Sequence, residues 1–350
     1  MRRFTLQLSL LAVLLIAILA GCGTQTGGSQ PGGGNGLEGQ NGQTYTMKLA
    51  HDMMPDTPFQ QSALKFKELV EERTNGRIKV EVYPAQQLGS AREMIEGLQL
   101  GTIEGVLLPS AKFGGFDQRL TILDLPFLFP NEDVMWKVLE GPIGRELMDN
   151  LKSIGLRGVC VYAEGFKAFT NNKPIHKPED FRGQKIRVME APVIVSTYKA
   201  WGANPVPIDY HEVYNALQQG VVDGHENPLL SIVAMKFYEV QKYIILSEHA
   251  YLPYVLVLSD KWFSSLPEDL QQIVFDTGLE VAQYHKQLMA EAEEGYLEEI
   301  KSSGKTTVYA LTPEEKEAFR VASQPVYEEF KNVIGEDLLN RTLKAVEEAS

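Results

Sequence analysis

The stretch FRGQKIRVMEAPVIVSTYKAWGANPVPIDYHEVYNALQQGVVDGHENP, residues 181–228, carries an isolated cation within an apolar strand pattern. In the segment KIRVM, strand alternation places Ile186 and Val188 on one face and Arg187 on the other. A planar, permanently charged guanidinium in this setting needs an anion, and a carboxylate binds it through two parallel hydrogen bonds. The strand alone therefore predicts either a bound carboxylate at Arg187 or an internal ion pair with a nearby Asp or Glu.

Two helix starts follow this strand. Asp209 can cap a helix with Glu212 at its third position, which is a capping-box pattern, and Gly220 ends that helix. Asn227 can cap the next helix, with Pro228 at the first helical position. Because helix N-termini attract anions, the pattern leaves Asn227 either as a ligand contact or only as a cap.

Several segments in this half of the chain resemble one known family. The segments that resemble it, in the same order, are GQKIRV, GANPVP, HEVYNALQQGVVDGHENP and MKFYEVQKY. The family is DctP, the extracytoplasmic solute-binding subunits of tripartite ATP-independent periplasmic (TRAP) transporters. Further similar segments are GRIKVEVYPAQQLGSAREMIEGLQLGTIEG, LDLPFLF and LPEDLQQIVFD, so the resemblance covers the chain from about residue 45 to its end. It implies an α/β, two-lobed periplasmic-binding-protein-like fold, with a ligand cleft between the lobes and a long helix bracing both.

The resemblance also implies a ligand and the residues that bind it. A small organic acid would lie between the lobes, with Arg187 on its carboxylate and Asn227 adding a hydrogen bond. Tyr210 stands where relatives place an aromatic ring, and Glu190 would accept hydrogen bonds from ligand hydroxyl groups. Lys167 stands where many relatives carry arginine, so it lies either near the ligand or on the solvated surface. With one arginine fork and one lysine, a monocarboxylate such as a sugar acid is favoured over a C4-dicarboxylate.

The first part of the chain alternates between strand and helix patterns, which predicts parallel pairing and an α/β lobe. The expected elements are strands at Tyr45–Ala50, 78–84 and Ile103–Leu108, and helices at Phe59–Arg73 and Ala91–Leu100. Ligands in such lobes meet the loops at the carboxyl ends of the strands. Asp52 lies in such a loop and is a further candidate ligand residue, whereas its neighbour His51 has either a turn role or a ligand contact.

We expect the chain to cross between the lobes twice, first near residues 164–171, where Gly165 can act as a hinge, and again near residues 251–254. The expected domains are a signal peptide (1–21), a lipidated flexible linker (22–43), lobe 1 (44–164 plus 253–292) and lobe 2 (165–252 plus 293–350). From Pro267 to Lys301 one helical pattern continues for about 50 Å, which is long enough to brace both lobes. A capped helix is also expected from Thr312.

The first 43 residues predict export and attachment to a membrane. Arg2 and Arg3 precede an apolar run that is too short to span a bilayer comfortably, and the run ends in LAGC, residues 19–22. This ending resembles a bacterial lipobox, in which Cys22 is lipidated and becomes the mature N-terminus; a plain signal peptide and an uncleaved anchor helix are the alternatives. Residues 23–43 have a linker composition. We therefore expect an extracytoplasmic lipoprotein, anchored in the periplasm or on the outer face of the cell membrane.

Composition argues against several other classes of protein. The formal net charge is −13, whereas a nucleic-acid-binding protein needs a basic face. Only two cysteines are present, Cys22 and Cys160, so no disulfide framework is expected. The sequence contains no GxSxG elbow, P-loop or strand-following GxGxxG, and no HExxH zinc motif. We expect a binding protein without catalysis.

Neither a metal nor another cofactor is expected. Some relatives hold a metal with a Glu-Trp pair where this chain has Glu226-Asn227. The expected partners are the organic acid, the small and large membrane subunits of a TRAP permease and the membrane, with the protein itself a monomer. An extracytoplasmic sensor that binds the same class of ligand remains the alternative, with an enzyme on this scaffold a third possibility.

Overall fold

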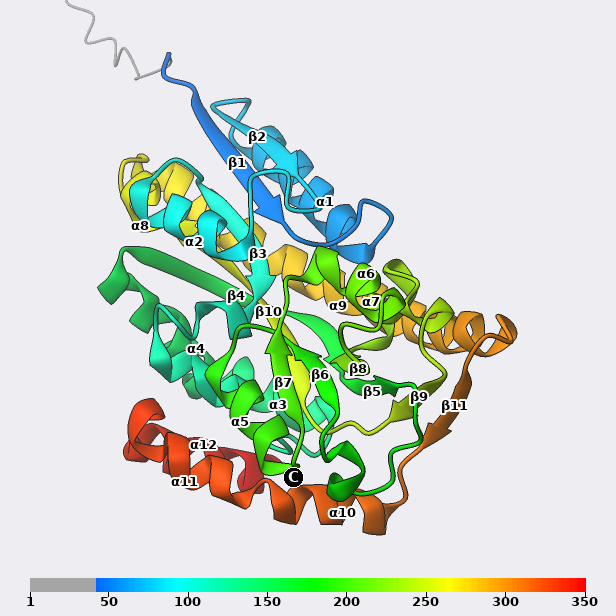
Figure 1. Ribbon diagram of the computed structural model, residues 1–350. Helices are drawn as coiled ribbons and strands as arrows, with labels where there is room; N and C mark the ends of the chain where they lie inside the picture. Colours follow the sequence, from blue (N-terminus) through cyan, green and yellow to red (C-terminus); the bar gives the residue numbers. More distant parts are fainter. Residues whose placement is uncertain (1–41) are drawn as a thin grey trace, which may run out of the picture. The chain divides into compact units, whose positions relative to one another are not determined.

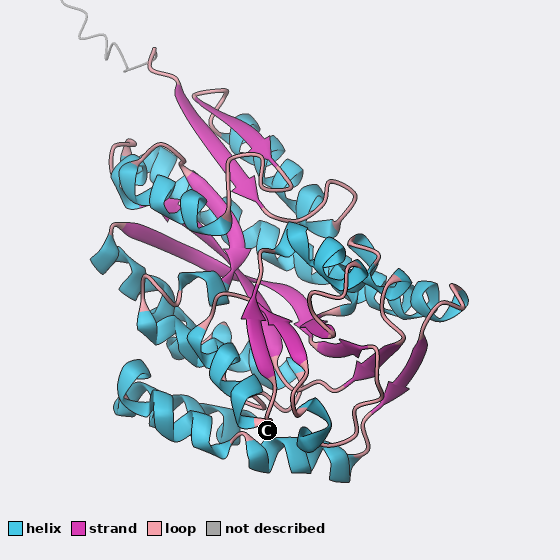
Figure 2. Cartoon of the chain, viewed as in Figure 1, coloured by secondary structure: helices cyan, strands magenta, loops and turns pink. Residues whose placement is uncertain are grey.

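Two β-sheets organise residues 42–350, the part of the chain that the computed structural model describes (Figures 1 and 2). The predicted signal peptide, Cys22 and the linker up to residue 41 lie outside the described residues. Within residues 42–350, no helix has both the length and the apolar character that a membrane span requires.

The first sheet has the strand order β2-β1-β3-β10-β4. Its strands are β1 (Tyr45–His51), β2 (Ile78–Tyr83), β3 (Gly105–Pro109), β4 (Leu156–Phe166) and β10 (Tyr251–Ser259). Strand β1 pairs in parallel with β2 and β3, which confirms the pairing predicted from the alternation of strands and helices. The connecting helices are α1 (Pro58–Arg73) and α2 (Ala91–Leu100), and α2 begins with a capping box formed by Ser90 and Glu93. Strand β10 runs antiparallel between β3 and β4.

The second sheet has the order β11-β9-β5-β8-β6-β7. Its strands are β5 (Ala168–Asn171), β6 (Lys185–Val188), β7 (Asn204–Pro207), β8 (Gly224–Asn227), β9 (Tyr243–Leu246) and β11 (Thr307–Ala310). Helices α5 (Pro192–Ala200), α6 (Val213–Gln218) and α7 (Leu229–Ala234) connect its middle strands. Strand β6 pairs in parallel with both β7 and β8, so Arg187 lies on an inner strand.

The two helix starts predicted in this region differ from the observed ones. Asp209 caps a short 3-10 turn, Tyr210–Glu212, by accepting a hydrogen bond from the His211 backbone N–H, and α6 begins only after this turn. Asn227 does not cap a helix, because it is the last residue of β8 and pairs with Ala168 of β5. Pro228 occupies the cap position of α7 instead. The cap interpretation of Asn227 was therefore wrong, since sheet pairing extends the strand to this residue.

The sheets are connected by two crossings and a long helix. Strand β4 ends at Phe166 and β5 begins at Ala168, so Lys167 alone separates the two sheets along the chain. The return crossing lies between β9 and β10. Helix α9 (Glu268–Ser302) has 35 residues and extends about 50 Å, as predicted. It packs on α1 and β4 beside the first sheet and on α7 and β11 beside the second, so it braces both (Figure 1).

Six further α-helices are present in residues 42–350: α3 (Glu132–Leu139), α4 (Pro142–Asn150), α8 (Asp260–Phe263), α10 (Pro313–Ala322), α11 (Gln324–Ile334) and α12 (Glu336–Ala349). The predicted cap of α10 is confirmed, with Thr312 and Glu315 in a capping box. Helices α10–α12 lie along the lower edge of Figure 1. Helix α12 also contacts the helices of the first sheet, since Arg341 forms an ion pair with Glu146 of α4 at 2.7 Å.

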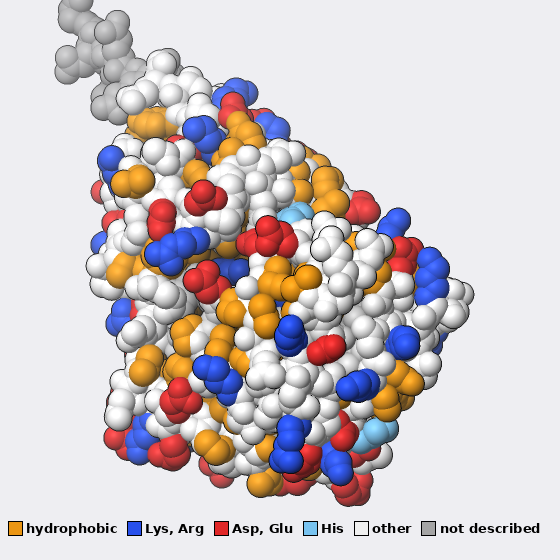
Figure 3. All heavy atoms as spheres, in the orientation of Figure 1, with side chains coloured by type: hydrophobic (Ala, Val, Ile, Leu, Met, Phe, Trp, Pro, Cys, Tyr) orange, Lys and Arg blue, Asp and Glu red, His pale blue; other side chains and the backbone are white. Residues whose placement is uncertain are grey.

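An aromatic cluster forms the core behind the second sheet. Trp201, which follows α5, stacks on Phe181 with ring centroids 5.9 Å apart and meets Phe319 of α10 at 5.1 Å. Phe169 of β5 packs edge-on against Phe181 at 5.1 Å. This packing fixes β5 and therefore the crossing that precedes it. On the face shown in Figure 3, acidic and basic side chains are interspersed around hydrophobic ones near the middle.

Candidate ligand-binding site

A cavity between the two sheets brings together four of the residues predicted to bind ligand. Arg187, Asn227, Tyr210 and Asp52 all line it. The remaining lining residues are Pro109, Lys112, Leu252 and Tyr254 from the first-sheet side, and Met189 and Ser231 from the second. The cavity is narrow, with a volume of about 10 Å³, which is about the space that one water needs.

Arg187 is the principal cation of this cavity. Its side chain is 1% exposed, and its Nε donates a hydrogen bond to the Ile208 carbonyl at 2.9 Å. Its Nη2 has no hydrogen-bond partner, and no carboxylate of residues 42–350 lies within ion-pair distance of it. Burial lowers the pKa of Arg187 to about 10, although the charges of Glu226 and Asp209 oppose this shift. The guanidinium is therefore charged at neutral pH and has an unused donor.

Lys112 is a second cation in the cavity, and sequence reasoning missed it. It lies in the 3-10 turn Ser110–Phe113 directly after β3 and makes no hydrogen bond or ion pair with any described residue. Burial lowers the pKa of Lys112, and the charge of Arg187 lowers it further, whereas Asp209 and Asp52 oppose both. The position of Lys112 after a parallel strand is a signal that could have identified it.

Asp52, Tyr210 and Asn227 supply further polar groups around these cations. Asp52 is 2% exposed with its Oδ1 unpartnered, and burial raises its pKa to about 6 although Lys112 lowers it. Tyr210 donates a hydrogen bond to Ser231 Oγ at 3.1 Å. The Nδ2 of Asn227 lies 3.0 Å from Nδ1 of His225. Burial lowers the pKa of His225 to about 3, so this ring stays neutral and its Nδ1 can accept from Asn227.

Lys167 and Glu190 do not line the cavity. Lys167 is 2% exposed, so it is not a surface lysine, and its Nζ lies 2.7 Å from Glu226 Oε1 in a buried ion pair. His249 Nε2 lies 2.6 Å from the other carboxylate oxygen of Glu226. Burial alone would raise the pKa of Glu226, but Lys167 and His249 together hold it well below its usual range. Glu190 is exposed, and its charge acts on Lys112.

His51 does not line the cavity either. It is buried, and its Nε2 lies 2.8 Å from Gln60 Oε1. Two further buried acids were not anticipated from the sequence. Asp124 has an unpartnered Oδ2, and burial raises its pKa to about 7. Glu164 accepts a hydrogen bond from Ser231, and burial raises its pKa to about 8.

Comparison with known proteins identifies the family. The family model DctP, described as bacterial extracellular solute-binding protein, family 7, matches residues 49–332. This chain belongs to the DctP family. The C4-dicarboxylate-binding periplasmic protein DctP of Rhodobacter capsulatus is 37% identical over 306 residues, which cover 87% of this chain and 90% of that protein.

Solved structures of similar proteins agree with the DctP assignment. A sugar acid binding protein from Advenella mimigardefordensis in complex with galactonate is 33% identical, with a TM-score of 0.84 over 88% of this chain and 99% of that one. A TRAP periplasmic solute-binding protein from Shewanella oneidensis with bound succinate is 33% identical, with a TM-score of 0.84 over 87% of this chain and 99% of that one. The predicted family and two-lobed α/β fold are confirmed, and the chain is an extracytoplasmic solute-binding subunit of a TRAP transporter.

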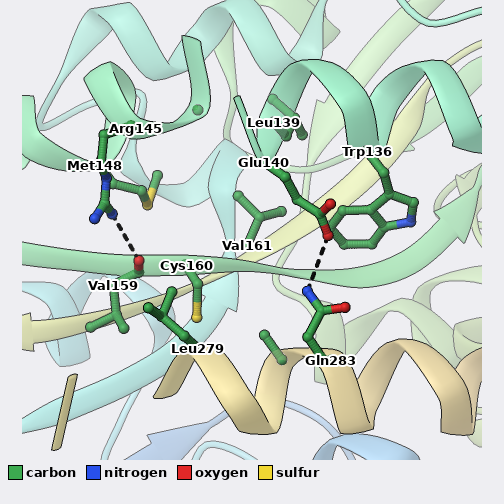
Figure 4. Close-up of a pocket in the computed structure, with 12 residues that line it drawn as sticks. Trp136, Leu139, Glu140, Arg145, Met148, Val159, Cys160, Val161, Leu279 and Gln283 are labelled. Carbon is green, nitrogen blue, oxygen red and sulfur yellow. Dashed lines mark hydrogen bonds between the residues drawn. The ribbon is translucent and has the colours of Figure 1, made fainter. Parts of the chain in front are cut away.

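A larger cavity in this DctP-family protein lies away from Arg187, between α3, α4, β4 and α9 (Figure 4). It has a volume of about 360 Å³. Arg145 of α4 donates to the Val159 carbonyl at 2.9 Å, and Gln283 of α9 donates to Glu140 at 3.1 Å (Figure 4). Among residues 42–350, none of the buried side-chain atoms left without a partner belongs to its lining. The cavity therefore offers no unmet polar group to orient a ligand, unlike the cavity at Arg187.

The described part of this DctP-family chain contains no group of three or more His, Cys, Asp or Glu residues arranged to hold a metal ion. The carboxylate of Glu226 contacts Lys167 and His249, one at each of its two oxygens. The cations of the ligand cavity and its unpartnered donor suit an anionic organic ligand.

Proposed function

We propose that the protein captures a small organic acid in the cavity around Arg187 and delivers it to a TRAP permease. The observation that carries this proposal is the buried guanidinium of Arg187, whose Nη2 has no acceptor. A buried donor without a partner is unfavourable, and a charged one more so. A ligand carboxylate would supply the missing acceptor in bidentate geometry. The bound succinate and galactonate of two related proteins, which both carry carboxylates, support this reading.

Lys112 supports a ligand with two carboxylates. It follows β3 of the first sheet, whereas Arg187 lies on β6 of the second, so a dicarboxylate that meets both would connect the two sides of the cavity. Lys167, the residue on which the monocarboxylate prediction rested, is already neutralised by Glu226. We therefore propose a C4-dicarboxylate such as succinate as the ligand class, in place of the sugar acid that the sequence favoured.

Capture would involve a hinge motion of the proposed lobes, residues 44–164 plus 253–292 and residues 165–252 plus 293–350. The narrow cavity supports this proposal, because a four-carbon acid needs more space than about 10 Å³. Closure would also remove water and strengthen the attraction between Arg187 and the carboxylate, since the effective dielectric constant falls. Asn227 and Tyr210 would then contact the bound acid, with Asp52 beside Lys112.

Titration calorimetry with succinate tests the proposal. Arg187→Lys keeps a positive charge but loses the fork, and we expect it to weaken succinate binding by roughly 2–5 kcal/mol, as for a cut buried charge pair. Lys185→Ala, in the same strand but with an exposed side chain, is the matched control and should bind as the wild type does. Equal affinity of Arg187→Lys and the wild type for succinate would exclude the carboxylate clamp.

A second comparison tests the dicarboxylate class. Lys112→Met should weaken the binding of succinate by about 1–3 kcal/mol and leave the binding of butyrate, a monocarboxylate of the same length, nearly unchanged. An equal loss for both acids would show that Lys112 does not recognise a second carboxylate.

We further propose that Cys22 carries a lipid that holds the protein at the membrane, supported by the LAGC sequence and the linker composition that follows it. Cell fractionation tests this proposal, because Cys22→Ser should move the protein from the membrane fraction to the soluble extracytoplasmic fraction. A protein that remains in the membrane fraction after this substitution would not be anchored through Cys22.

A further inference from the structure

A cavity of about 430 Å³ lies at the crossings between the two sheets, separate from the cavity at Arg187. Its walls come from the end of β4 and the start of β5, the start of α7, the end of β9 and the second half of α9. Small-molecule sites in proteins typically have volumes of about 300–1,000 Å³. The hinge cavity, as we name the space lined by these elements, therefore has the size of a ligand site.

The walls of the hinge cavity are apolar with an acidic border. Phe166, Leu229, Leu246, Met289 and Leu297 supply the apolar surface. The four acids of the lining are Glu164, Glu248, Glu293 and Glu294, whereas Lys167 is its only basic residue.

Two of these four acids, Glu293 and Glu294, carry negative charge that no base in the described part of the chain compensates, since burial raises the pKa of Glu164 to about 8 and leaves it mostly neutral at pH 7. The Nζ of Lys167 forms an ion pair with Glu226 Oε1 at 2.7 Å, so it does not neutralise the acids of the lining. The Nζ of Lys316 forms an ion pair with Glu248 Oε2 at 2.5 Å. Glu293 and Glu294 form no ion pair with any residue between 42 and 350. The border therefore repels anions and attracts cations.

Glu164 adds an unmet hydrogen-bonding group to the same cavity. Its side chain is 3% exposed, its Oε1 accepts from the Ser231 hydroxyl, and its Oε2 has no partner. Burial raises the pKa of Glu164 to about 8, and a cation placed beside this oxygen would favour the ionised carboxylate and donate a hydrogen bond to it. A purely apolar molecule would leave this oxygen unsatisfied.

We propose that the hinge cavity binds a small amphipathic cation, namely a primary amine on a short apolar chain. The ammonium lies toward Glu164, Glu293 and Glu294, and the chain packs against the apolar walls. This second site takes a ligand of opposite charge from the organic acid, and it does not depend on the proposed function of the Arg187 cavity.

Titration of the protein with hexylamine, followed by backbone amide NMR shifts, tests the proposal. We expect saturable shifts at residues lining the hinge cavity, with a Kd on the order of 1 mM for so small a ligand. Hexanol and hexanoate, which match the chain but lack the ammonium, should bind much more weakly. Hexanol binding as tightly as hexylamine, or the absence of saturation with hexylamine, would overturn the proposal.

Variants on α9 locate the site. The double variant Glu293→Gln and Glu294→Gln should weaken hexylamine binding roughly three- to tenfold, as expected for two partly exposed charges. Glu298→Gln, on the same helix but outside the lining, is the matched control and should bind hexylamine as the wild type does. Equal binding by the double variant and the wild type would contradict the proposal.

The variant Arg187→Lys distinguishes the test of amine binding in the hinge cavity from the test of acid binding at Arg187. It should weaken succinate binding and leave hexylamine binding intact, so that a failure of one proposal is recognised without a failure of the other. Loss of hexylamine binding in Arg187→Lys would place the amine in the wrong cavity and overturn the inference.

Discussion

Asp124 links the stability of the protein to pH at the level of a single side chain. Burial raises its pKa to about 7, although Lys167 opposes the shift. Between about pH 4 and pH 7 the folded protein therefore holds a proton on Asp124 that the unfolded chain has released. Because the folded state binds more protons in this range, the free energy of unfolding falls as pH rises.

Asp124→Asn should remove this dependence. As the pH rises from 5 to 8, the Asp124 carboxyl is expected to lower the free energy of unfolding of the wild type by about 2–3 kcal/mol. The variant lacks this carboxyl and should not show this part of the decrease. Urea unfolding of both proteins at the two pH values measures the difference. Other buried groups contribute to both proteins and cancel in the comparison: Asp52 and Glu164, whose pKa values burial raises to about 6 and about 8, and His225 and His285, whose pKa values burial lowers to about 3 and about 4.

The exposed Asp56→Asn serves as the control for this experiment and should follow the wild type at both pH values. If Asp124→Asn loses as much stability as the wild type between pH 5 and pH 8, the carboxyl of Asp124 is not the group responsible.

Helix α9 shows how one element is fitted against its neighbours. A Cβ added at Gly278 would lie 2.7 Å from Val159 Cγ1 of β4 and 3.0 Å from Leu256 Cδ2 of β10. The same helix contains Gly295, where an added Cβ would meet nothing within 4 Å. The two glycines therefore separate the effect of packing from the effect of helix propensity.

We expect Gly278→Ala to destabilise the protein by about 1–3 kcal/mol through overpacking, in spite of the better helix propensity of alanine. Gly295→Ala should instead stabilise it by roughly 0.5–1 kcal/mol. Chemical denaturation of the two variants measures both values. A stabilised Gly278→Ala variant would mean that α9 moves easily away from β4 and β10.

The sequence predicted the regular elements well and the assembled site only in part. Helix α9 and the strands of the first sheet follow directly from hydrophobic periodicity, which is a local property. The sequence left Asn227 as a ligand contact or a helix cap, and its pairing with β5, a long-range interaction that the sequence does not show, rules out the cap. Lys112 was missed for the same kind of reason, since it approaches Arg187 only when the two sheets face each other.

Lys167 illustrates a further limit of sequence reasoning. Its partners Glu226 and His249 come from β8 and from the return crossing, so nothing near it in the chain indicates that its charge is neutralised. Resemblance to the family pointed to a place near the ligand, whereas the buried ion pair depends on side chains 59 and more positions away.

At the scale of the whole molecule, we expect the proposed lobe motion to depend on Gly165. It lies near the end of β4 with φ of +137°, a backbone conformation that residues with a Cβ rarely adopt. An added Cβ would have only Pro228 Cβ within 4 Å, at 3.5 Å, which is an ordinary van der Waals contact. A substitution there acts on the backbone of the crossing and hardly at all on packing.

Gly165→Ala should weaken succinate binding by about 1–3 kcal/mol, because the strained backbone disfavours the arrangement in which the cavity walls are close together. Gly155→Ala, where φ is +79° at the turn before β4, carries a similar backbone strain away from the crossings. It should lower the Tm and leave the Kd for succinate unchanged. Calorimetry on the two variants tests the hinge, and an unchanged Kd for Gly165→Ala would contradict it.

Glu164 belongs to the lining of the hinge cavity, yet through Ser231 it is also connected to Tyr210 in the cavity around Arg187, where we propose that the organic acid binds. If an amine favours one arrangement of the crossings, it changes the affinity of the protein for the acid by some factor. By thermodynamic reciprocity, the acid then changes the affinity for the amine by the same factor. A receptor built in this way would sense the two molecules jointly, and its response to the acid would depend on the supply of amine outside the cell.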